Sequence, residues 1–384
     1  MKRLIVCALL IASLVGVCHA AETVYPVSPD LFSLQVESAV LMEKTTGTVI
    51  YEKCPTLRLA PASVTKVMTM LLVVEAIEGG VVQLDEVVTA SAHARSMGGS
   101  QIWLEEGEQM SVSDMLKCVA VVSANDCAVA LAEHLAGSEE AFVGRMNERA
   151  ASLGCADTHF TNCTGLFDDD DHYTCARDLA VMSRELISHE MIKAYTTIWT
   201  DSVRGGEFGL SNTNKLIRYY AGATGLKTGY TSKAGHCLAA TAERDGTEYI
   251  AVVMNGVNSA ARFEAAKTLL NYAFASCARI ELRPESAIAP VPVRLGMADA
   301  VQPVCDGPEC VLLEKSKTAA LHREIELLEY VEAPVKRGDV LGRLIVSASG
   351  CAVYEVPLVA ADDVDRMGTF QIFSLLFRVF VGKN

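Results

Sequence analysis

Ser63 and Lys66 stand three positions apart at the start of a segment that is predicted to be helical. Residues at i and i+3 lie on one face of a helix, so the hydroxyl and the amine come within hydrogen-bonding reach. A serine hydroxyl is a weak nucleophile at neutral pH unless an adjacent base activates it. A lysine can act as that base if its pKa is lowered. Alone, the pair also fits a capping serine beside a solvent-exposed lysine.

The segment that follows provides a reason for a lowered lysine pKa. Residues 67–74 are apolar on every side of the expected helix, which indicates a buried helix. Pro61 suits its first turn and Gly79 its end. Burial would remove water from Lys66 and so favour its neutral form.

A second pair of polar residues, Ser123 and Asn125, lies between two predicted helices, 112–122 and 126–136. Ser123 could relay a proton, and Asn125 could donate to a substrate amide. By themselves these are ordinary loop and cap residues. Their position between the other two motifs gives them weight.

A third motif, Lys227-Thr228-Gly229, opens a predicted strand that continues through residue 241. Asp245-Gly246 then predicts a hairpin turn into a strand over 248–254. A lysine on a strand edge would add positive charge beside the serine. The missing Cβ of Gly229 would let a substrate backbone approach. The alternative is an edge strand whose lysine only blocks aggregation.

Attack by an activated serine on a carbonyl group also needs hydrogen-bond donors for the negative charge that develops on the carbonyl oxygen. The backbone N–H groups of Ser63 and Tyr230 are predicted to supply them. Loss of one such donor typically costs about 3–4 kcal/mol in the transition state. The three motifs together predict a serine acyl-transfer enzyme.

In type and order the motifs resemble those of low-molecular-mass penicillin-binding proteins, the serine-type D-alanyl-D-alanine carboxypeptidases of peptidase family S11. The sporulation-associated subgroup is the one most resembled. The resemblance covers nearly the whole chain and is strongest over 38–274. Supporting stretches are residues 96–101, 162–166, 172–174 and 212–214.

The resemblance implies that Ser63 is the acylated nucleophile and Lys66 its base. Ser123, Asn125 and Lys227 would assist proton transfer and substrate placement.

It also implies that Thr228 and Arg262 hold the terminal carboxylate of D-alanine, which the planar fork of arginine suits. Gly229 and Tyr230 complete the expected substrate-binding set. Several relatives carry histidine at the position of Tyr230, so substrate preference stays open. As a lone residue, Arg262 also fits a surface cation.

The function so implied is removal of the terminal D-alanine from peptidoglycan stem pentapeptides, without a cofactor, and covalent inhibition by β-lactam antibiotics. A serine β-lactamase is the first alternative. Such enzymes deacylate with a glutamate between the second and third motifs, and no glutamate occurs between Glu148 and Glu185. A D,D-endopeptidase with a roomier site, and an inactive wall-binding scaffold, are the others.

The order of elements predicts an α+β fold, a β-lactamase/transpeptidase-like antiparallel sheet covered by helices. A hairpin over 38–52 and strands after residue 227 would form the sheet, and a helix over 260–274 would close the domain. Seven of the 11 prolines follow Arg283, which predicts a small all-β domain. The expected divisions are a leader (1–20), a catalytic domain (21–280), the β domain (281–362) and an amphipathic helix (363–384).

The termini predict the location. Lys2-Arg3, an apolar core over 4–17 and a cleavage site after Ala20 are typical of a secretory signal. Residues 369–381 are rich in Phe, Leu, Ile and Val, and their polar Gln371, Ser374 and Arg378 fall on one helical face. Because spanning needs about 20 apolar residues, the segment predicts a peripheral anchor on the outer face of the cytoplasmic membrane. A helix docked on the protein itself is the alternative.

Charge and cysteine content exclude other classes. A net charge of −14 argues against a nucleic-acid partner. The sequence has no Cys-x-x-Cys pair or histidine cluster at metal-ligand spacing, so no metal is expected, and 168–171 is predicted to be a solvated acidic loop rather than a calcium site. Cys118, Cys127 and Cys237 fall in apolar segments, where buried thiols are expected, while the spacing of Cys305 and Cys310 allows a small-loop disulfide.

Overall fold

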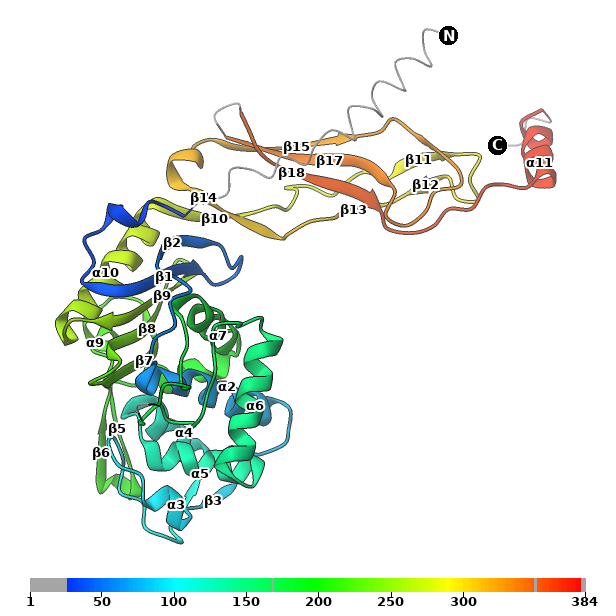
Figure 1. Cartoon of the computed structure of the whole chain (residues 1–384). Helices are drawn as coiled ribbons and strands as arrows, with labels where there is room; N and C mark the ends of the chain where they lie inside the picture. The colour runs from blue at the N-terminus through cyan, green and yellow to red at the C-terminus, as the bar shows by residue number, and fades with distance from the viewer. Residues whose placement is uncertain (1–25, 168, 349–350, 381–384) are drawn as a thin grey trace. The chain divides into compact units, whose positions relative to one another are not determined.

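The computed structural model describes residues 26–167, 169–348 and 351–380, and divides the chain into two compact units (Figure 1). The larger unit ends at Cys277, and the smaller begins at Ala278. The predicted leader, residues 1–20, lies outside the described residues.

A five-stranded antiparallel sheet forms one part of the larger unit. Its order is β2 (Val49–Lys53), β1 (Val36–Glu43), β9 (Thr247–Gly256), β8 (Gly235–Arg244) and β7 (Ala223–Thr231). The predicted hairpin between β1 and β2 is confirmed, as is the turn at Asp245-Gly246 between β8 and β9. The strand β7 is an edge strand, so one of its sides is open to a ligand.

Helices cover both faces of this sheet. Residues 249–254 of β9 are all buried, although successive side chains of a strand point to opposite faces. Tyr249 packs its ring edge-on against Phe274 of α10 (Ser259–Ser276), while Ile250, Val252 and Met254 join the core of the helical part. Asn258 caps α10 by accepting from the backbone N–H of Ala261 at 2.8 Å.

The helical part is built around α2 (Lys66–Glu78), whose residues 66–71 are all buried. This confirms the predicted buried helix. The other long helices of this part are α4 (Val112–Val121), α5 (Asn125–Ala136), α6 (Glu139–Ser152) and α7 (Ala176–Ser188). Shorter elements are α3 (Ala92–Arg95), α8 (Lys193–Thr196), α9 (Leu216–Tyr219), β3 (Val87–Thr89), β4 (Gln109–Ser111), β5 (Thr200–Val203) and β6 (Phe208–Ser211).

The single strand predicted from Lys227 to residue 241 is wrong. The chain turns at residues 232–234, so that β7 and β8 form a hairpin in which Lys227 lies opposite Ala239. Thr231 accepts the backbone N–H of Ala234 at 3.1 Å and stabilises this turn. Residues 231–236 are polar or small, and Gly235 adopts φ +61°, so the turn has a local signal that the prediction of one strand passed over.

The smaller unit is all β up to its last helix. Its longest sheet has the order β13 (Pro303–Cys305), β18 (Cys351–Ala360), β17 (Val340–Ala348) and β15 (Leu321–Leu327). The remaining strands are β10 (Cys277–Glu281), β11 (Val291–Arg294), β12 (Ala300–Val301), β14 (Cys310–Glu314) and β16 (Val331–Glu332). The predicted fold class, with its small all-β module, is confirmed.

The last helix, α11 (Thr369–Phe380), exposes one apolar stripe. Phe370, Phe373 and Phe377 recur at spacings of three and four, and their exposed fractions are 85%, 71% and 63%. Within the described part of the chain, no helix combines the length and apolar content needed to cross a bilayer.

The cysteines between residues 54 and 310 are thiols. Cys118, Cys127 and Cys237 are buried, as expected. The disulfide considered between Cys305 and Cys310 is not formed. Cys305 ends β13, which pairs with β18, whereas Cys310 begins β14, which pairs with β10 in a different sheet.

Candidate active site

Ser63 lies in a short 3₁₀ turn, Ala62–Thr65, that leads directly into α2. Ala62 adopts φ +49°, in the left-handed region that a residue with a Cβ rarely occupies. Ala62, Val64 and Thr65 are buried, and Ser63 is half-buried. The turn therefore presents the Ser63 hydroxyl while its neighbours are packed inward.

Lys66 points its amine at Ser63 from the first position of α2. The Lys66 Nζ lies 3.1 Å from Ser63 Oγ, 2.6 Å from Asn125 Oδ1 and 2.7 Å from the carbonyl oxygen of Thr164. The side chain is fully buried, so the alternative of a capping serine beside a solvent-exposed lysine is wrong. None of its three hydrogen-bond partners is a carboxylate.

Burial lowers the pKa of Lys66 to about 7, although Cys163 and Asp126 act in the opposite direction. A neutral amine has two N–H groups and one lone pair. Asn125 Oδ1 and the Thr164 carbonyl can only accept, so they take the two N–H groups. The lone pair is left for the hydroxyl of Ser63, which is the arrangement of a general base and its nucleophile.

Asn125, at the start of α5, is held by the segment over residues 98–100. Its Nδ2 donates to the carbonyl of Gly98 at 2.7 Å, and its backbone N–H donates to the carbonyl of Ser100 at 2.7 Å. Since the amide nitrogen faces a carbonyl, the Oδ1 must face Lys66. Asn125 thus orients the base through its oxygen.

Ser123 sits in the link between α4 and α5 with φ +65°. Its side chain is 3% exposed, and its Oγ has no hydrogen-bond partner among the described residues. A buried hydroxyl left without a partner costs about 1–3 kcal/mol. Such a group fits one whose partner arrives with the substrate.

Lys227 of β7 is 1% exposed, so the interpretation as an exposed gatekeeping lysine is wrong. Its Nζ donates to the carbonyl of Thr228 at 3.0 Å. Burial, and after it the positive charges of Lys66 and Arg262, hold the pKa of Lys227 well below its usual value. This lysine and Lys66 therefore belong to one electrostatic unit.

Gly229 brings β7 against the turn that carries Ser63. A Cβ at Gly229 would lie 2.9 Å from the carbonyl oxygen of Pro61, 3.0 Å from the backbone nitrogen of Val64 and 3.1 Å from that of Ser63. The sequence suggested that this glycine admits a substrate backbone. The backbone that needs the space is the chain's own.

Arg262 lies on α10 beneath β7, where it is 9% exposed. One guanidinium nitrogen donates to the carbonyl of Gly229 at 2.9 Å and to that of Cys237 at 3.3 Å. Burial lowers its pKa from the ordinary value. Arg262 is therefore not the surface cation that was its alternative.

Thr228 and Tyr230 face different neighbours along β7. The hydroxyl of Thr228 donates to that of Thr213 at 2.7 Å, within the supporting stretch 212–214. Tyr230 is 59% exposed and stacks on His236, its partner across the hairpin, with ring centroids 4.4 Å apart. The structure thus brings the predicted residues of all three motifs to one region, around the turn at Ser63.

The loop over residues 161–172 completes the site, and its roles were missed from the sequence. Asn162 Oδ1 accepts the backbone N–H groups of Thr164 and Gly165 at 3.1 and 2.6 Å, which places the Thr164 carbonyl against Lys66. Asn-x-Thr-Gly is a turn signature that could have identified this bend. At Gly165, φ is +70° and a Cβ would lie 1.9 Å from the carbonyl oxygen of Ala62.

His172 connects this loop to the serine turn. Its Nδ1 accepts the backbone N–H of Thr161 at 3.0 Å, so its Nε2–H donates to Thr65 Oγ1 at 2.8 Å. The Thr65 hydroxyl in turn donates to the carbonyl of Ala62 at 2.8 Å. Burial lowers the pKa of His172 to about 4, so the ring stays neutral and the relay keeps its direction.

No candidate cation site overlaps these residues in the described part of the chain. Glu75, Glu185 and His189 form the group with metal-ligand spacing there, and Arg149 donates to both carboxylates at 2.6 Å. In the acidic loop, Asp170 pairs with Lys233, and Asp168 lies outside the described residues.

Two protein-family models match the chain. The D-alanyl-D-alanine carboxypeptidase model matches residues 23–258, and the penicillin-binding protein 5 C-terminal domain model matches residues 283–366. The D-alanyl-D-alanine carboxypeptidase DacF of Bacillus subtilis is 40% identical over 339 residues, which are 87% of each chain. DacA of Haemophilus influenzae is 30% identical over 91% of this chain and 90% of its own.

Solved structures agree with these matches. Penicillin-binding protein 5 from Haemophilus influenzae superposes with a TM-score of 0.77 at 28% identity, over 88% of this chain and all of that one. Penicillin-binding protein D2 from Listeria monocytogenes, solved in an ampicillin-bound form, has a TM-score of 0.58 at 29% identity, over 63% of this chain and 99% of its own.

We expect the rate constant for acylation of Ser63 by benzylpenicillin to rise about tenfold per pH unit below pH 7 and to level off above it. Below its pKa of about 7, Lys66 is protonated and has no lone pair for the serine hydroxyl. Stopped-flow acylation from roughly pH 5 to 9 measures this profile. Lys66→Arg stays protonated and should lose about 10²–10⁴-fold, whereas Lys117→Gln on α4 should keep the profile. A rate independent of pH would contradict a neutral lysine base.

A second prediction concerns the hydroxyl of Thr65. Thr65→Val keeps the shape of the side chain but leaves the Nε2–H of His172 and the carbonyl of Ala62 without a hydrogen-bond partner. Each buried group left unpaired costs about 1–3 kcal/mol of stability. We expect acylation to slow about tenfold. Thr65→Ser, which restores the hydroxyl, should stay within about twofold of wild type. Equal rates for the two variants, measured at one pH above 7, would show that the relay does not position Ser63.

Proposed function

Because this chain belongs to the D-alanyl-D-alanine carboxypeptidase family of serine peptidases, we propose that it removes the terminal D-alanine from peptidoglycan stem pentapeptides through an acyl-enzyme on Ser63. The observation that supports these residue roles is the set of three hydrogen bonds around the amine of Lys66. With both N–H groups committed to Asn125 and Thr164, the amine has one remaining interaction, and Ser63 Oγ occupies it.

Acylation follows from that contact. Ser63 Oγ attacks the carbonyl carbon of the penultimate D-alanine, and its proton passes to Lys66 Nζ. The N–H groups of Ser63 and Tyr230 stabilise the oxyanion. When the tetrahedral intermediate collapses, the C–N bond breaks, and the leaving amine of D-alanine takes a proton that Ser123 relays from Lys66. Ser123 Oγ has no partner among the described residues, so it is free to bond the leaving amine, and it would have to reach Lys66 when the substrate is bound.

Deacylation reverses these roles. Water attacks the ester carbonyl while Lys66, neutral again, takes the proton of the water. The bond between the carbonyl carbon and Ser63 Oγ then breaks, and Lys66 returns the proton to Ser63 Oγ, which frees the shortened peptide and restores the enzyme. No glutamate follows Glu148 before Glu185, and the loop presents the Thr164 carbonyl to Lys66. Without a carboxylate partner there, a bound penicillin should be released slowly. This favours the carboxypeptidase over the β-lactamase alternative.

Recognition of the substrate carboxylate falls to β7 and the charges beneath it. The Thr228 hydroxyl would donate to the terminal carboxylate. Arg262, buried at this strand, would supply positive charge from below. Lys227 is buried there too, and because its pKa is held low in the free enzyme, it would gain its proton when the carboxylate binds beside it. Arg262 also fixes the Gly229 carbonyl and so positions the strand. An inactive scaffold would have no need to keep two lysines buried at such cost.

Peptidoglycan lies outside the cytoplasm, so we propose that the enzyme acts there. Its exposed stripe of Phe370, Phe373 and Phe377 supports a peripheral anchor on the membrane surface. We propose the division of the chain at about residue 280, with residues 281–362 as a spacer that holds the catalytic unit away from the membrane.

We expect benzylpenicillin to add its full mass to Ser63 and to remain attached for many times the duration of one D-alanine turnover. Intact-mass spectrometry over time follows the adduct, and a coupled assay follows D-alanine release from a pentapeptide. Ser63→Ala should abolish both, and Ser113→Ala, a serine of α4, should change neither. Rapid loss of the adduct with consumption of the drug would instead indicate a β-lactamase.

The anchor is tested on vesicles that contain phosphatidylglycerol. The full chain should float with them in a density gradient, and Phe373→Asp combined with Phe377→Asp should remain in the soluble fraction with unchanged D-alanine release. Val81→Asp combined with Val257→Asp provides the control, because these exposed apolar residues lie in the other unit. Flotation of the Phe373/Phe377 variant would contradict the anchor.

A further inference from the structure

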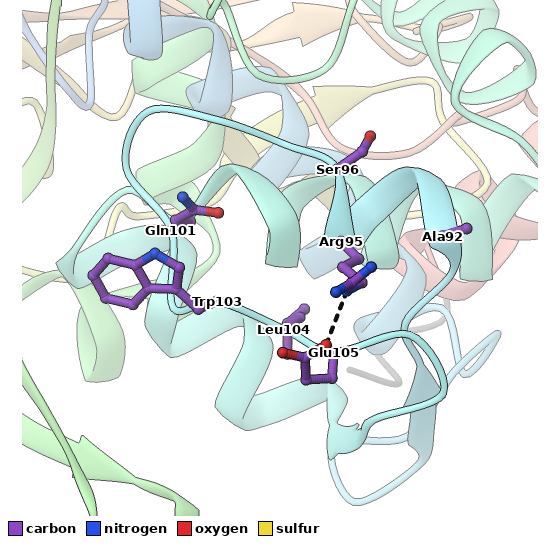
Figure 2. A pocket seen from close by; sticks show the side chains of 7 residues that line it. All are labelled: Ala92, Arg95, Ser96, Gln101, Trp103, Leu104 and Glu105. Carbon is purple, nitrogen blue, oxygen red and sulfur yellow. Dashed lines mark hydrogen bonds and ion pairs between the residues drawn. The ribbon is translucent and has the colours of Figure 1, made fainter.

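A shallow cavity of about 220 Å³ lies beside the segment that holds Asn125 (Figure 2). It is lined by Ala92, Arg95, Ser96, Gln101, Trp103, Leu104 and Glu105. Pockets for drug-sized ligands begin at roughly 300 Å³, so this one suits a single ring. None of these residues takes part in the chemistry at Ser63.

The segment from Gln101 to Glu105 forms one wall of the cavity. Ile102 and Leu104 are buried, and their backbone N–H groups donate to the carboxylate of Asp126 at 3.0 and 3.1 Å. Gln101, Trp103, Leu104 and Glu105 all line the cavity (Figure 2). Asp126 follows Asn125 in the chain, so these hydrogen bonds connect the cavity wall to the active site.

The backbone of Trp103 is strained. Its side chain is 64% exposed, and its φ of +56° is a genuine outlier for a bulky residue. Strain of this kind persists where surrounding structure enforces it, and it marks ligand-binding sites. Here Arg204 donates to the carbonyl oxygens of Ile102 and Trp103, and Phe208 meets the indole edge-on at 5.8 Å.

The polar lining is electrically balanced. Arg95 Nε and Glu105 Oε2 form an ion pair at 2.9 Å across the cavity from Trp103, and these are its charged residues (Figure 2). Gln101 and Ser96 add neutral donors and acceptors. A ligand with a free carboxylate or amine would call for an unpaired opposite charge. An uncharged ring with hydroxyl and amide groups and one apolar face fits this lining.

We propose that this cavity binds a sugar ring of the peptidoglycan strand, an N-acetylhexosamine, with its apolar face on Trp103. The proposal rests on the proposed function, because it concerns the sugar that carries the stem peptide. The five steps along the chain from Gly98 to Trp103 span at most about 18 Å. The four stem residues between the sugar and the scissile bond span about 14 Å when extended, so the two lengths are compatible.

Fluorescence tests the binding directly, since the chain has two tryptophans. In a Trp199→Phe variant, Trp103 is the sole tryptophan. Titration with the peptide-free disaccharide GlcNAc–MurNAc should change its emission saturably, while the free pentapeptide should not. No change with the disaccharide, or an equal change with the pentapeptide, would overturn the proposal.

Kinetics separates the sugar site from the catalytic site. The value of kcat/KM for D-alanine release should be higher for the disaccharide-pentapeptide than for the free pentapeptide. Trp103→Ala should lower this ratio about tenfold, to near one, with benzylpenicillin acylation unchanged. Tyr219→Ala, an equally exposed aromatic residue on α9, should keep the ratio. Absence of a preference in the wild type, or equal losses on both substrates, would refute the sugar site. Failure of the wild-type protein to form the benzylpenicillin adduct on Ser63 would instead refute the proposed function.

Discussion

Burial of one amine underlies the rest of this site. In water a lysine is protonated near neutral pH and cannot accept the proton of a serine. Here Lys66 begins a helix that is enclosed on all sides, and burial lowers its pKa to about 7. The helix must be apolar around its whole circumference for this reason. A helix with one wet face would return water to the amine and, with it, the positive charge.

Burial alone would leave the direction of the lone pair open. That direction is set by two acceptors that come from distant parts of the chain, Asn125 at the start of α5 and the Thr164 carbonyl in the loop before α7. Each is itself fixed by backbone hydrogen bonds, from Asn125 to Gly98 and Ser100 and from the turn at Asn162. The chemistry of Ser63 therefore depends on the packing of the helices and loops as much as on the motifs.

The sequence was sufficient for whatever depends on local pattern. The buried helix after Ser63, the helices on either side of Ser123, and the hairpins β1–β2 and β8–β9 follow from periodicity and turn residues, and the resemblance of the motifs located the site. Long-range contacts were not accessible in this way. A backbone carbonyl at Thr164 has no sequence signature as a ligand, and the neutral relay of His172 depends on burial that no single residue encodes. The turn between β7 and β8 is marked locally by polar residues and Gly235, so there the prediction failed on a signal that the sequence contains.

Two glycines enclose the serine turn from opposite directions, Gly165 from the loop and Gly229 from β7. A Cβ on either would approach main-chain atoms of the turn at 1.9 or 2.9 Å, where no side chain can give way. Substitution is therefore restricted at these two positions, because even alanine would displace the turn that presents Ser63. Heritable changes in drug susceptibility have more freedom at exposed positions around the mouth of the site, such as Tyr230.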